Sequence, residues 1–271
     1  MTRTKDTENF PVGSWLVEAR LRPTVHAFYR FARAADDIAD EPAMAPGDKV
    51  RLLDAMDAEL QGAPGDGVAA QVRARLSEIG VPVVHCRELL VAFKRDAVKP
   101  RTADWADLMD YCRYSAAPVG RFLLDLHGES PDTWAASDAL CAALQVLNHL
   151  QDCRDDFRAL DRVYLPDDSF RSAGAIVEEL GYAKASPAIR QVLDAAIANT
   201  RPLIAAARAL PGGIRNGGLR REAAVIVAIA ERLVEELARR DPLAERVELS
   251  KFELVKAGIA GLGRSLFPGG R

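Results

Sequence analysis

The sequence predicts an all-α fold that forms a single domain over residues 1–271. Three observations support this prediction: apolar residues recur at the 3.6-residue period of a helix in almost every segment, the two-residue alternation of strands is absent, and the linkers are short. Apolar residues make up 49% of the chain and their share does not shift along it, so one large core is expected.

The first helices are marked by prolines and glycines. Pro23 suits the first turn of a helix whose pattern runs to Asp40 and stops before Pro42. A second helix is expected at about 48–61. The stretch 62–67, with three glycines and a proline, is the clearest loop in the chain.

The later helices follow the same period. A helix at 104–127 should bend at Pro118, and Ser137 suits the cap of a long, mostly apolar helix at 137–158. The remaining helices are expected at 68–79, 82–98, 172–181, 186–209, 218–240 and 250–262.

Composition excludes some classes of function. The formal net charge of −3 gives no electrostatic reason to expect a nucleic-acid partner. The four cysteines form no C-x-x-C pair and lie inside helical patterns, so we expect reduced thiols in the core of a cytoplasmic protein. The polar N-terminus carries no apolar run typical of a signal peptide, and no stretch is long and apolar enough for a membrane span.

The first helix carries an acidic stripe. At about 100° per residue, one narrow ribbon contains Tyr29, Arg33, Asp36 and Asp40. This ribbon borders the apolar face instead of lying opposite it. A carboxylate in such a place must be paired, bound to metal or turned toward a wet cavity.

A second polar stripe lies on the helix expected at 137–158. Its members recur at i, i+3, i+7 and i+11 and are Gln145, Asn148, Asp152 and Asp156. The preceding turns are apolar nearly all round, which places the helix near the centre of the fold. Polar groups on such a helix would be costly without a ligand.

Two facing stripes suit magnesium. A single D-D-x-x-D pattern is usually a solvated face or a set of ion pairs, but two stripes on separate apolar helices can grip one anion from both sides. Mg²⁺ prefers oxygen ligands and combines one or two carboxylates with substrate phosphates, so two or three ions are expected on a diphosphate. No His or Cys stands at ligand spacing beside these aspartates, which disfavours zinc.

These patterns resemble the motifs of the squalene/phytoene synthase family of head-to-head prenyl synthases. Its R-x-x-D-D-x-x-D motif is matched by Arg33, Asp36, Asp37 and Asp40. Its second motif, Q-x-x-N-x-x-x-D-x-x-x-D, is matched by the second stripe. A Tyr-Cys segment ending in Val-Gly is matched by 111–120, and an arginine before Tyr-Leu-Pro is matched by 162–166. The resemblance, in register from about Asn9 to Leu165, implies a helical bundle of the isoprenoid synthase type with a central cavity.

Within the family, the segments 8–12 and 27–33 look most like the hydroxysqualene synthase branch. That resemblance implies Mg²⁺-assisted ionisation of presqualene diphosphate, cation rearrangement and capture by water, without NADPH. Gln151 in place of the family's usual arginine, and Ser115 in place of its usual valine, make the pocket more polar, which favours water capture. No Ser-Lys or Ser-Arg phosphate contact is evident near Glu8, which fits a substrate with one diphosphate.

The expected roles follow from the stripes and the resemblance. We expect catalysis to depend on Tyr111 and on four aspartates that bind Mg²⁺. Tyr111 is a candidate for cation stabilisation or proton handling, and the alternative is that it only packs. The metal-binding aspartates are Asp36, Asp40, Asp152 and Asp156. Asn148 supplies an amide oxygen to the metal or holds an aspartate. Asp37 is expected to bond within its own helix. The resemblance assigns substrate contacts to Tyr29, Arg33, Gln145, Asn148, Arg162 and Tyr164. Ser115, Asn148 or Gln151 is expected to hold the reacting water, and His149 to pack.

Two other functions stay open. The chain could condense two prenyl diphosphates to presqualene diphosphate, dehydrosqualene or phytoene, or it could be an inactive scaffold or assembly protein, although the intact acidic motifs speak against the latter. The hydroxysqualene assignment implies functional coupling to a presqualene diphosphate synthase and to a hydroxysqualene reductase. Peripheral contact with the inner membrane also stays open, because a hydrophobic substrate would come from it.

Overall fold

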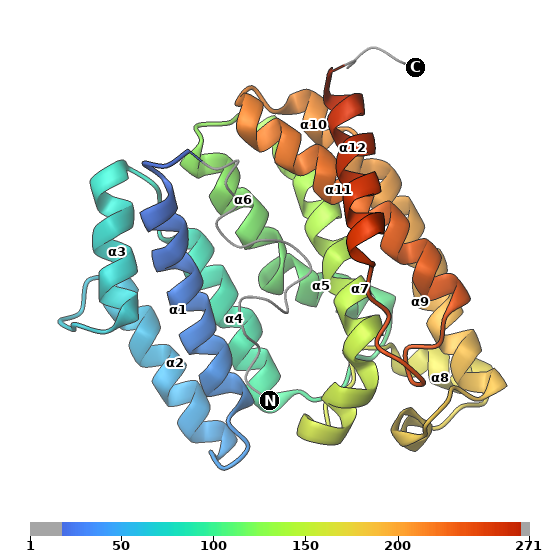
Figure 1. Cartoon of the computed structure of the whole chain (residues 1–271). Helices are drawn as coiled ribbons and strands as arrows, with labels where there is room; N and C mark the ends of the chain where they lie inside the picture. Colours follow the sequence, from blue (N-terminus) through green and yellow to red (C-terminus); the bar gives the residue numbers. More distant parts are fainter. Residues whose placement is uncertain (1–17, 267–271) are drawn as a thin grey trace.

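The structure, a computed structural model, describes residues 18–266. Within that range the chain forms twelve α-helices, two short 3₁₀ helices and no β-strand, which confirms the all-α fold (Figure 1). The bounds are α1 (Arg22–Asp40), α2 (Pro46–Leu60), α3 (Val68–Ile79), α4 (Val84–Val98), α5 (Trp105–Ser115), α6 (Ala117–Leu126), η1 (Pro131–Thr133), α7 (Trp134–Leu160), α8 (Asp167–Ala173), η2 (Val177–Gly181), α9 (Pro187–Ala207), α10 (Leu210–Gly213), α11 (Gly217–Arg239) and α12 (Lys251–Leu266). The segment 8–12, which contributed to the resemblance, lies outside the described residues.

Most of the predicted helices are present within a few residues. The helix predicted at 172–181 is wrong. Helix α8 instead begins right after Pro166, with two aspartates in its first turn, and ends at Gly174, whose φ of 65° is left-handed. The segment after it forms only the 3₁₀ turn η2, since the glycine stops the α-helical path.

Two details around the long central helix also differ from expectation. Ser137 does not cap α7, which begins one turn earlier at Trp134 and buries this serine. The bend expected at Pro118 is a complete break between α5 and α6 at Ala116. Pro118 lies in the first turn of α6, where its missing N–H leaves no hydrogen bond unmade.

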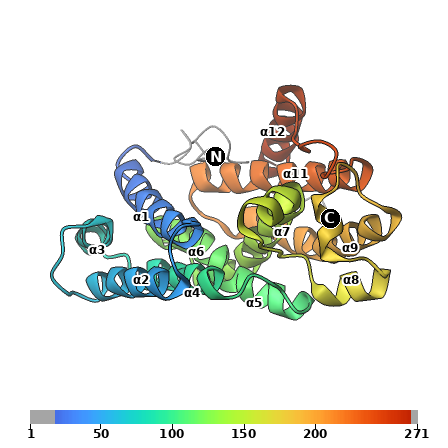
Figure 2. The ribbon, with the colours of Figure 1, turned by 90° about the horizontal axis from the view of Figure 1, so that it is seen from below.

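Two clusters of buried apolar side chains fill the bundle. The first lies among α1, α2, α3, α4 and α6 and includes Phe31 and Phe122. The second is larger and gathers around α7, which packs against α5, α6, α9 and α11. Figures 1 and 2 show α1 on one side of the molecule and α7 across from it, with α4 and α6 between them. None of the helices between residues 18 and 266 has the length and apolar character needed to span a membrane.

The four cysteines are free thiols, as expected. Three of them are buried and Cys141 is half-buried. Burial raises the pKa of the Cys86 and Cys112 thiols to about 12, which keeps these groups protonated and unreactive at neutral pH.

Helices α6 and α7 approach each other closely at Gly120. A Cβ at this position would lie 2.3 Å from the hydroxyl oxygen of Ser137 and 2.7 Å from the sulfur of Cys141. We therefore expect Gly120→Ala to lower the free energy of unfolding by about 1 to 3 kcal/mol, since these two side chains or the packed helices must shift to make room. Urea unfolding followed by circular dichroism measures this change.

The control is Gly47→Ala in the exposed first turn of α2. Nothing lies within 4 Å of the place that the alanine methyl group would take, so this change should leave stability unchanged or raise it by up to about 1 kcal/mol. Equal effects of the two substitutions would contradict a packing role for Gly120.

Candidate active site

The stripe on α1 borders the core, as predicted. Phe28, Ala35 and Ala39 are buried, whereas the side chains of Asp36 and Asp40 are a little more than one-third exposed. Arg33 lies beside them with a side chain 24% exposed, and its guanidinium contacts Asp36 at 3.1 Å and Asp37 at 2.8 Å. Arg33 therefore makes the ion pairs that helical spacing allows, and Asp37 bonds within its own helix.

The second stripe lies on α7, where the chain is more deeply enclosed. Asp152 is only 6% exposed, and Gln145, Asn148 and Asp156 are half-buried. The amide nitrogen of Gln145 lies 3.3 Å from the Nε2 atom of His149, one turn further along. The polar groups of this helix thus sit in a largely desolvated setting, as its apolar surroundings predict.

Arg162 joins the two acidic helices. It follows the end of α7, where the backbone of Val163 donates to the carbonyl of Pro100 at 2.8 Å and fixes the chain. The guanidinium of Arg162 is buried and contacts the Asp40 carboxylate at the end of α1 at 2.7 Å. Burial opposes its charge, but Tyr164, Asp96 and Asp40 more than offset this and raise its pKa above the ordinary value.

Asp96 stands at the centre of this network, although sequence reasoning missed it. Tyr111 donates to one of its carboxylate oxygens at 2.7 Å and Tyr164 donates to the other at 3.1 Å. Arg162 contacts the backbone carbonyl of the same residue at 3.4 Å. Burial raises the pKa of Asp96 to about 6, against the opposing effects of Arg162 and the two tyrosine hydroxyls.

Aromatic rings surround the network. Tyr164 stacks on His149 with 3.6 Å between ring centroids, and Tyr111 lies 5.1 Å from Tyr164. Burial is also the main reason why the pKa values of both tyrosines lie well above the ordinary value, so their hydroxyls stay protonated and donate. His149 packs, as expected. Phe28 and Phe122 stack at 3.9 Å between α1 and α6.

The segment between α11 and α12, residues 240–250, covers the second stripe. Arg246 contacts the Asp152 carboxylate at 3.1 Å, a partner that sequence reasoning missed. Leu243 and Val247 of this segment are fully buried. The amide nitrogen of Gln151 donates to the carbonyl of Val247 at 2.6 Å, so this side chain fastens the segment to α7.

Ser115 differs from Gln151 in its hydrogen bonding. Its hydroxyl is buried and has no hydrogen-bond partner among residues 18–266. It lies one helical turn after Tyr111, on the same side of α5. A buried hydroxyl without a partner is costly, so the site suits a polar ligand such as water.

The acidic groups fit magnesium by their chemistry. Carboxylate and amide oxygens are the ligands that Mg²⁺ prefers. In the part of the chain that the structure describes, no three His, Cys, Asp or Glu side chains lie close enough to hold an ion by themselves. A bound ion would therefore draw on phosphate and water oxygens as well as on these residues.

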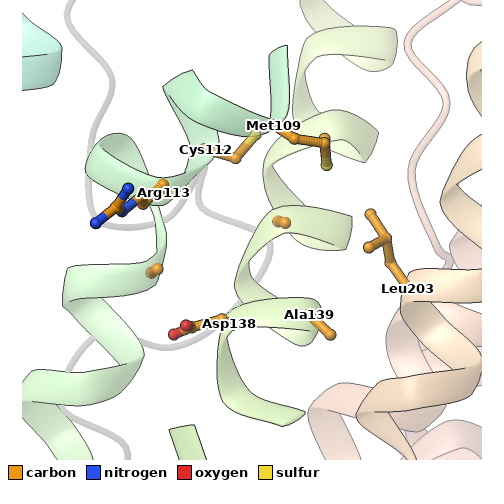
Figure 3. Close-up of a pocket in the computed structure, with 8 residues that line it drawn as sticks. Met109, Cys112, Arg113, Asp138, Ala139 and Leu203 are labelled. Atoms are coloured by element: carbon orange, nitrogen blue, oxygen red, sulfur yellow. The ribbon is translucent and has the colours of Figure 1, made fainter. Parts of the chain in front are cut away.

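A cavity of about 260 Å³ has a lining that shares no residue with this network (Figure 3). Residues of α5, α6, α7 and α9 line it, among them Met109, Cys112 and Leu203, and none of the predicted site residues does. Asp138 at its edge pairs with Arg121 through two contacts, the longer of them 2.9 Å. The cavity is thus mainly apolar and lacks the carboxylate pairs of the candidate active site.

The ionisation of Asp96 should make the free energy of unfolding depend on pH. Its pKa is higher in the folded chain than the ordinary 3.8, so the folded state holds the proton more tightly and stability falls as the pH rises from about 4 through about 6. Asp96→Asn removes the ionisable carboxyl and with it this decrease in stability at higher pH. Relative to the unchanged protein, we expect the variant to gain up to about 3 kcal/mol in unfolding free energy between pH 4 and pH 7, with urea titrations at both ends as the measurement. A difference that does not vary with pH would contradict the assignment.

Comparison with known proteins agrees with the motifs. The family model described as squalene/phytoene synthase matches residues 3–253. The hydroxysqualene synthase of Sinorhizobium fredii is 48% identical over 257 residues, which cover 94% of this chain and 88% of that protein. The hydroxysqualene synthase of Rhodopseudomonas palustris is 47% identical over 265 residues, covering 97% and 91%.

A solved structure agrees as well. The crystal structure of squalene synthase HpnC from Alicyclobacillus acidocaldarius superposes with a TM-score of 0.76 and 31% identity. The match covers 87% of this chain and 90% of that one, so the similarity extends over most of the bundle.

Proposed function

The chain belongs to the squalene/phytoene synthase family, and from this premise we propose that it is a hydroxysqualene synthase. It ionises presqualene diphosphate, lets the cation rearrange and captures the product cation with water, giving hydroxysqualene and diphosphate. The observation that carries the proposal is close to 50% identity, over almost the full length of the chain, with two proteins of that name. The alternatives of a condensing synthase and of an inactive scaffold are not favoured.

Two helices would hold the metal. Asp36 and Asp40 at the end of α1, and Asp152, Asp156 and Asn148 on α7, offer the oxygen ligands. Bound Mg²⁺ would neutralise charge on the diphosphate as the carbon–oxygen bond breaks. The guanidinium groups that now contact Asp40 and Asp152 show that both carboxylates already attract positive charge.

Arginines and tyrosines would bind the anion. Arg33 and Arg162 suit a diphosphate because a guanidinium donates two parallel hydrogen bonds to phosphate oxygens. Arg246 contacts Asp152 and adds a positive charge at the second stripe. Tyr29, Gln145 and Tyr164 would then position the substrate.

Aromatic faces would protect the cation. The Phe28–Phe122 pair and Tyr111 offer π faces that stabilise positive charge, and the hydrogen bonds to Asp96 keep the Tyr111 ring in place. Among the residues expected to hold the reacting water, Ser115 is favoured over Gln151. The Ser115 hydroxyl has no hydrogen-bond partner in the described part of the chain, whereas the Gln151 amide donates to Val247.

Product analysis tests the proposal. Presqualene diphosphate with Mg²⁺ should give an alcohol in the presence or absence of NADPH, as detected by mass spectrometry. Farnesyl diphosphate alone should give no product, because a separate presqualene diphosphate synthase must supply the substrate, as a hydroxysqualene reductase must consume the alcohol. Product from farnesyl diphosphate, or squalene formed only with NADPH, would overturn the assignment.

A further inference from the structure

Helix α12 turns an apolar stripe toward solvent. Phe252, Val255 and Ile259 recur at i, i+3 and i+7, so they share one side of the helix. Their exposed fractions are 66%, 58% and 66%, and among the described residues Phe252 and Ile259 are the most exposed large apolar side chains. A soluble surface rarely presents such a continuous stripe without a use for it.

The opposite side of α12 is fixed against α11. Ala257 is buried there, and at Gly261 the helix approaches so closely that a Cβ would lie 2.6 Å from the backbone carbonyl oxygen of Ala224. Glu253 adds an ion pair of 2.8 Å with Arg232 of α11. These contacts set the rotation of the helix, so the stripe cannot turn inward without breaking them.

The charges beside the stripe are positive. Lys251 and Lys256 are exposed and flank the stripe on its two sides, and the Lys256 ammonium lies 4.4 Å from the centroid of the Phe252 ring. Glu253, the acidic residue nearest to them on α12, is neutralised by Arg232. The outward side therefore combines apolar side chains with two lysines, the pattern of a helix that lies in a membrane interface.

We propose that α12 docks the enzyme on the surface of an anionic lipid bilayer, with the stripe among the acyl chains and the lysines at the phosphates. A second copy of the chain fits less well, because stripe-to-stripe contact would bring lysines together without acidic partners. The choice of a bilayer rests on the proposed function, whose substrate and product are lipids. Figure 2 shows α12 projecting from the side of the molecule that carries α1 and α11, opposite α2, α4 and α5.

Vesicle flotation tests the proposal. The full chain should float with vesicles of equal parts phosphatidylcholine and phosphatidylglycerol, and more weakly with phosphatidylcholine alone. Val255→Glu/Ile259→Glu should lower the partition coefficient about tenfold or more, because two charges replace apolar side chains that the bilayer would bury. Lys251→Gln/Lys256→Gln should lower the partition coefficient about 30-fold on the anionic vesicles and leave it unchanged on phosphatidylcholine vesicles. Each lysine near an anionic surface raises the partition coefficient about fivefold.

The control is Val84→Glu/Val91→Glu, which alters two exposed valines on α4, at 42% and 46% exposure, and should leave flotation unchanged. The proposal would be overturned if Val255→Glu/Ile259→Glu lost no vesicle binding, or if the α4 control lost as much vesicle binding as this α12 variant. A dimer in sedimentation that the α12 substitutions dissociate, without vesicle binding by the original chain, would overturn it in favour of a second copy.

Activity separates this proposal from the proposed function. With presqualene diphosphate dispersed in detergent, the α12 variants should turn over at the original rate, and with substrate embedded in anionic vesicles they should be slower. An enzyme that floats on vesicles but does not consume presqualene diphosphate would refute the function and leave the docking surface standing.

Discussion

Replacing Asp152 by asparagine should lower the rate of product formation from presqualene diphosphate about a thousandfold, which corresponds to about 4 kcal/mol in the barrier. Asp152 is 6% exposed on α7, and an amide there would weaken the proposed Mg²⁺ site, whose role is to assist the departure of the diphosphate. Single-turnover rates across a range of Mg²⁺ concentrations measure the effect. The apparent affinity for Mg²⁺ should fall together with the rate.

The matched control is Asp155→Asn on the same helix. Asp155 is exposed and does not belong to the second stripe, so its replacement should change the rate by less than about threefold. Loss of the Asp152 ion pair with Arg246 could also loosen the segment 240–250 and lower the rate in that way. A thermal unfolding midpoint close to that of the original chain would show that the rate falls without such loosening. A rate near the original value in Asp152→Asn would refute the metal-binding role.

Arg162→Gln should reduce both stability and activity. Removing a guanidinium from a buried network leaves charges without their partner, a change that costs about 3 to 5 kcal/mol for a fully buried pair. Since the Asp40 side chain is 38% exposed, water screens part of this loss, and we expect a decrease of about 2 kcal/mol in unfolding free energy. The rate should fall about a hundredfold, because the substitution removes the proposed guanidinium donor to the diphosphate.

Arg101→Gln serves as the control for Arg162. Arg101 also reaches the segment after α7, where it contacts Asp161 at 2.6 Å, but this pair is exposed and should contribute less than about 1 kcal/mol. Urea unfolding and initial rates of both variants give the comparison. If Arg162→Gln were as stable and as active as Arg101→Gln, Arg162 would neither join the two acidic helices nor bind the anion.

The fold was predictable where local forces decide it. The first helix is placed within one residue because Pro23 and Pro42 mark its ends, and the loop 62–67 follows from its glycines. The helix predicted at 172–181 is wrong because Gly174 ends α8 in a left-handed conformation, while the periodic apolar residues beyond it resemble a continuing helix. The break at Ala116 was predicted only as a bend, since a proline in a helical pattern is compatible with both.

Two residues of the site carried no signal in the sequence. Asp96 follows Lys94 and Arg95 near the end of a helix, a pattern typical of a solvated helix terminus. Its partners Tyr111 and Tyr164 come 15 and 68 residues later, and only the packed bundle brings their hydroxyls to one carboxylate. Arg246 belongs to a linker and reaches Asp152 across 94 residues of chain.

The helical class, the two acidic stripes and the family resemblance could be read from the sequence, because helical period and side-chain chemistry are local properties that depend only on the spacing of residues along the chain. Which charges far apart in the sequence meet depends on the packing of the bundle. This packing placed Arg162 between Asp40 and Asp96, laid the segment 240–250 over α7 and left the stripe of α12 in solvent. The physical reason is that ion pairing and desolvation depend on distances through space, and residues far apart in the chain acquire those distances only when the core packs.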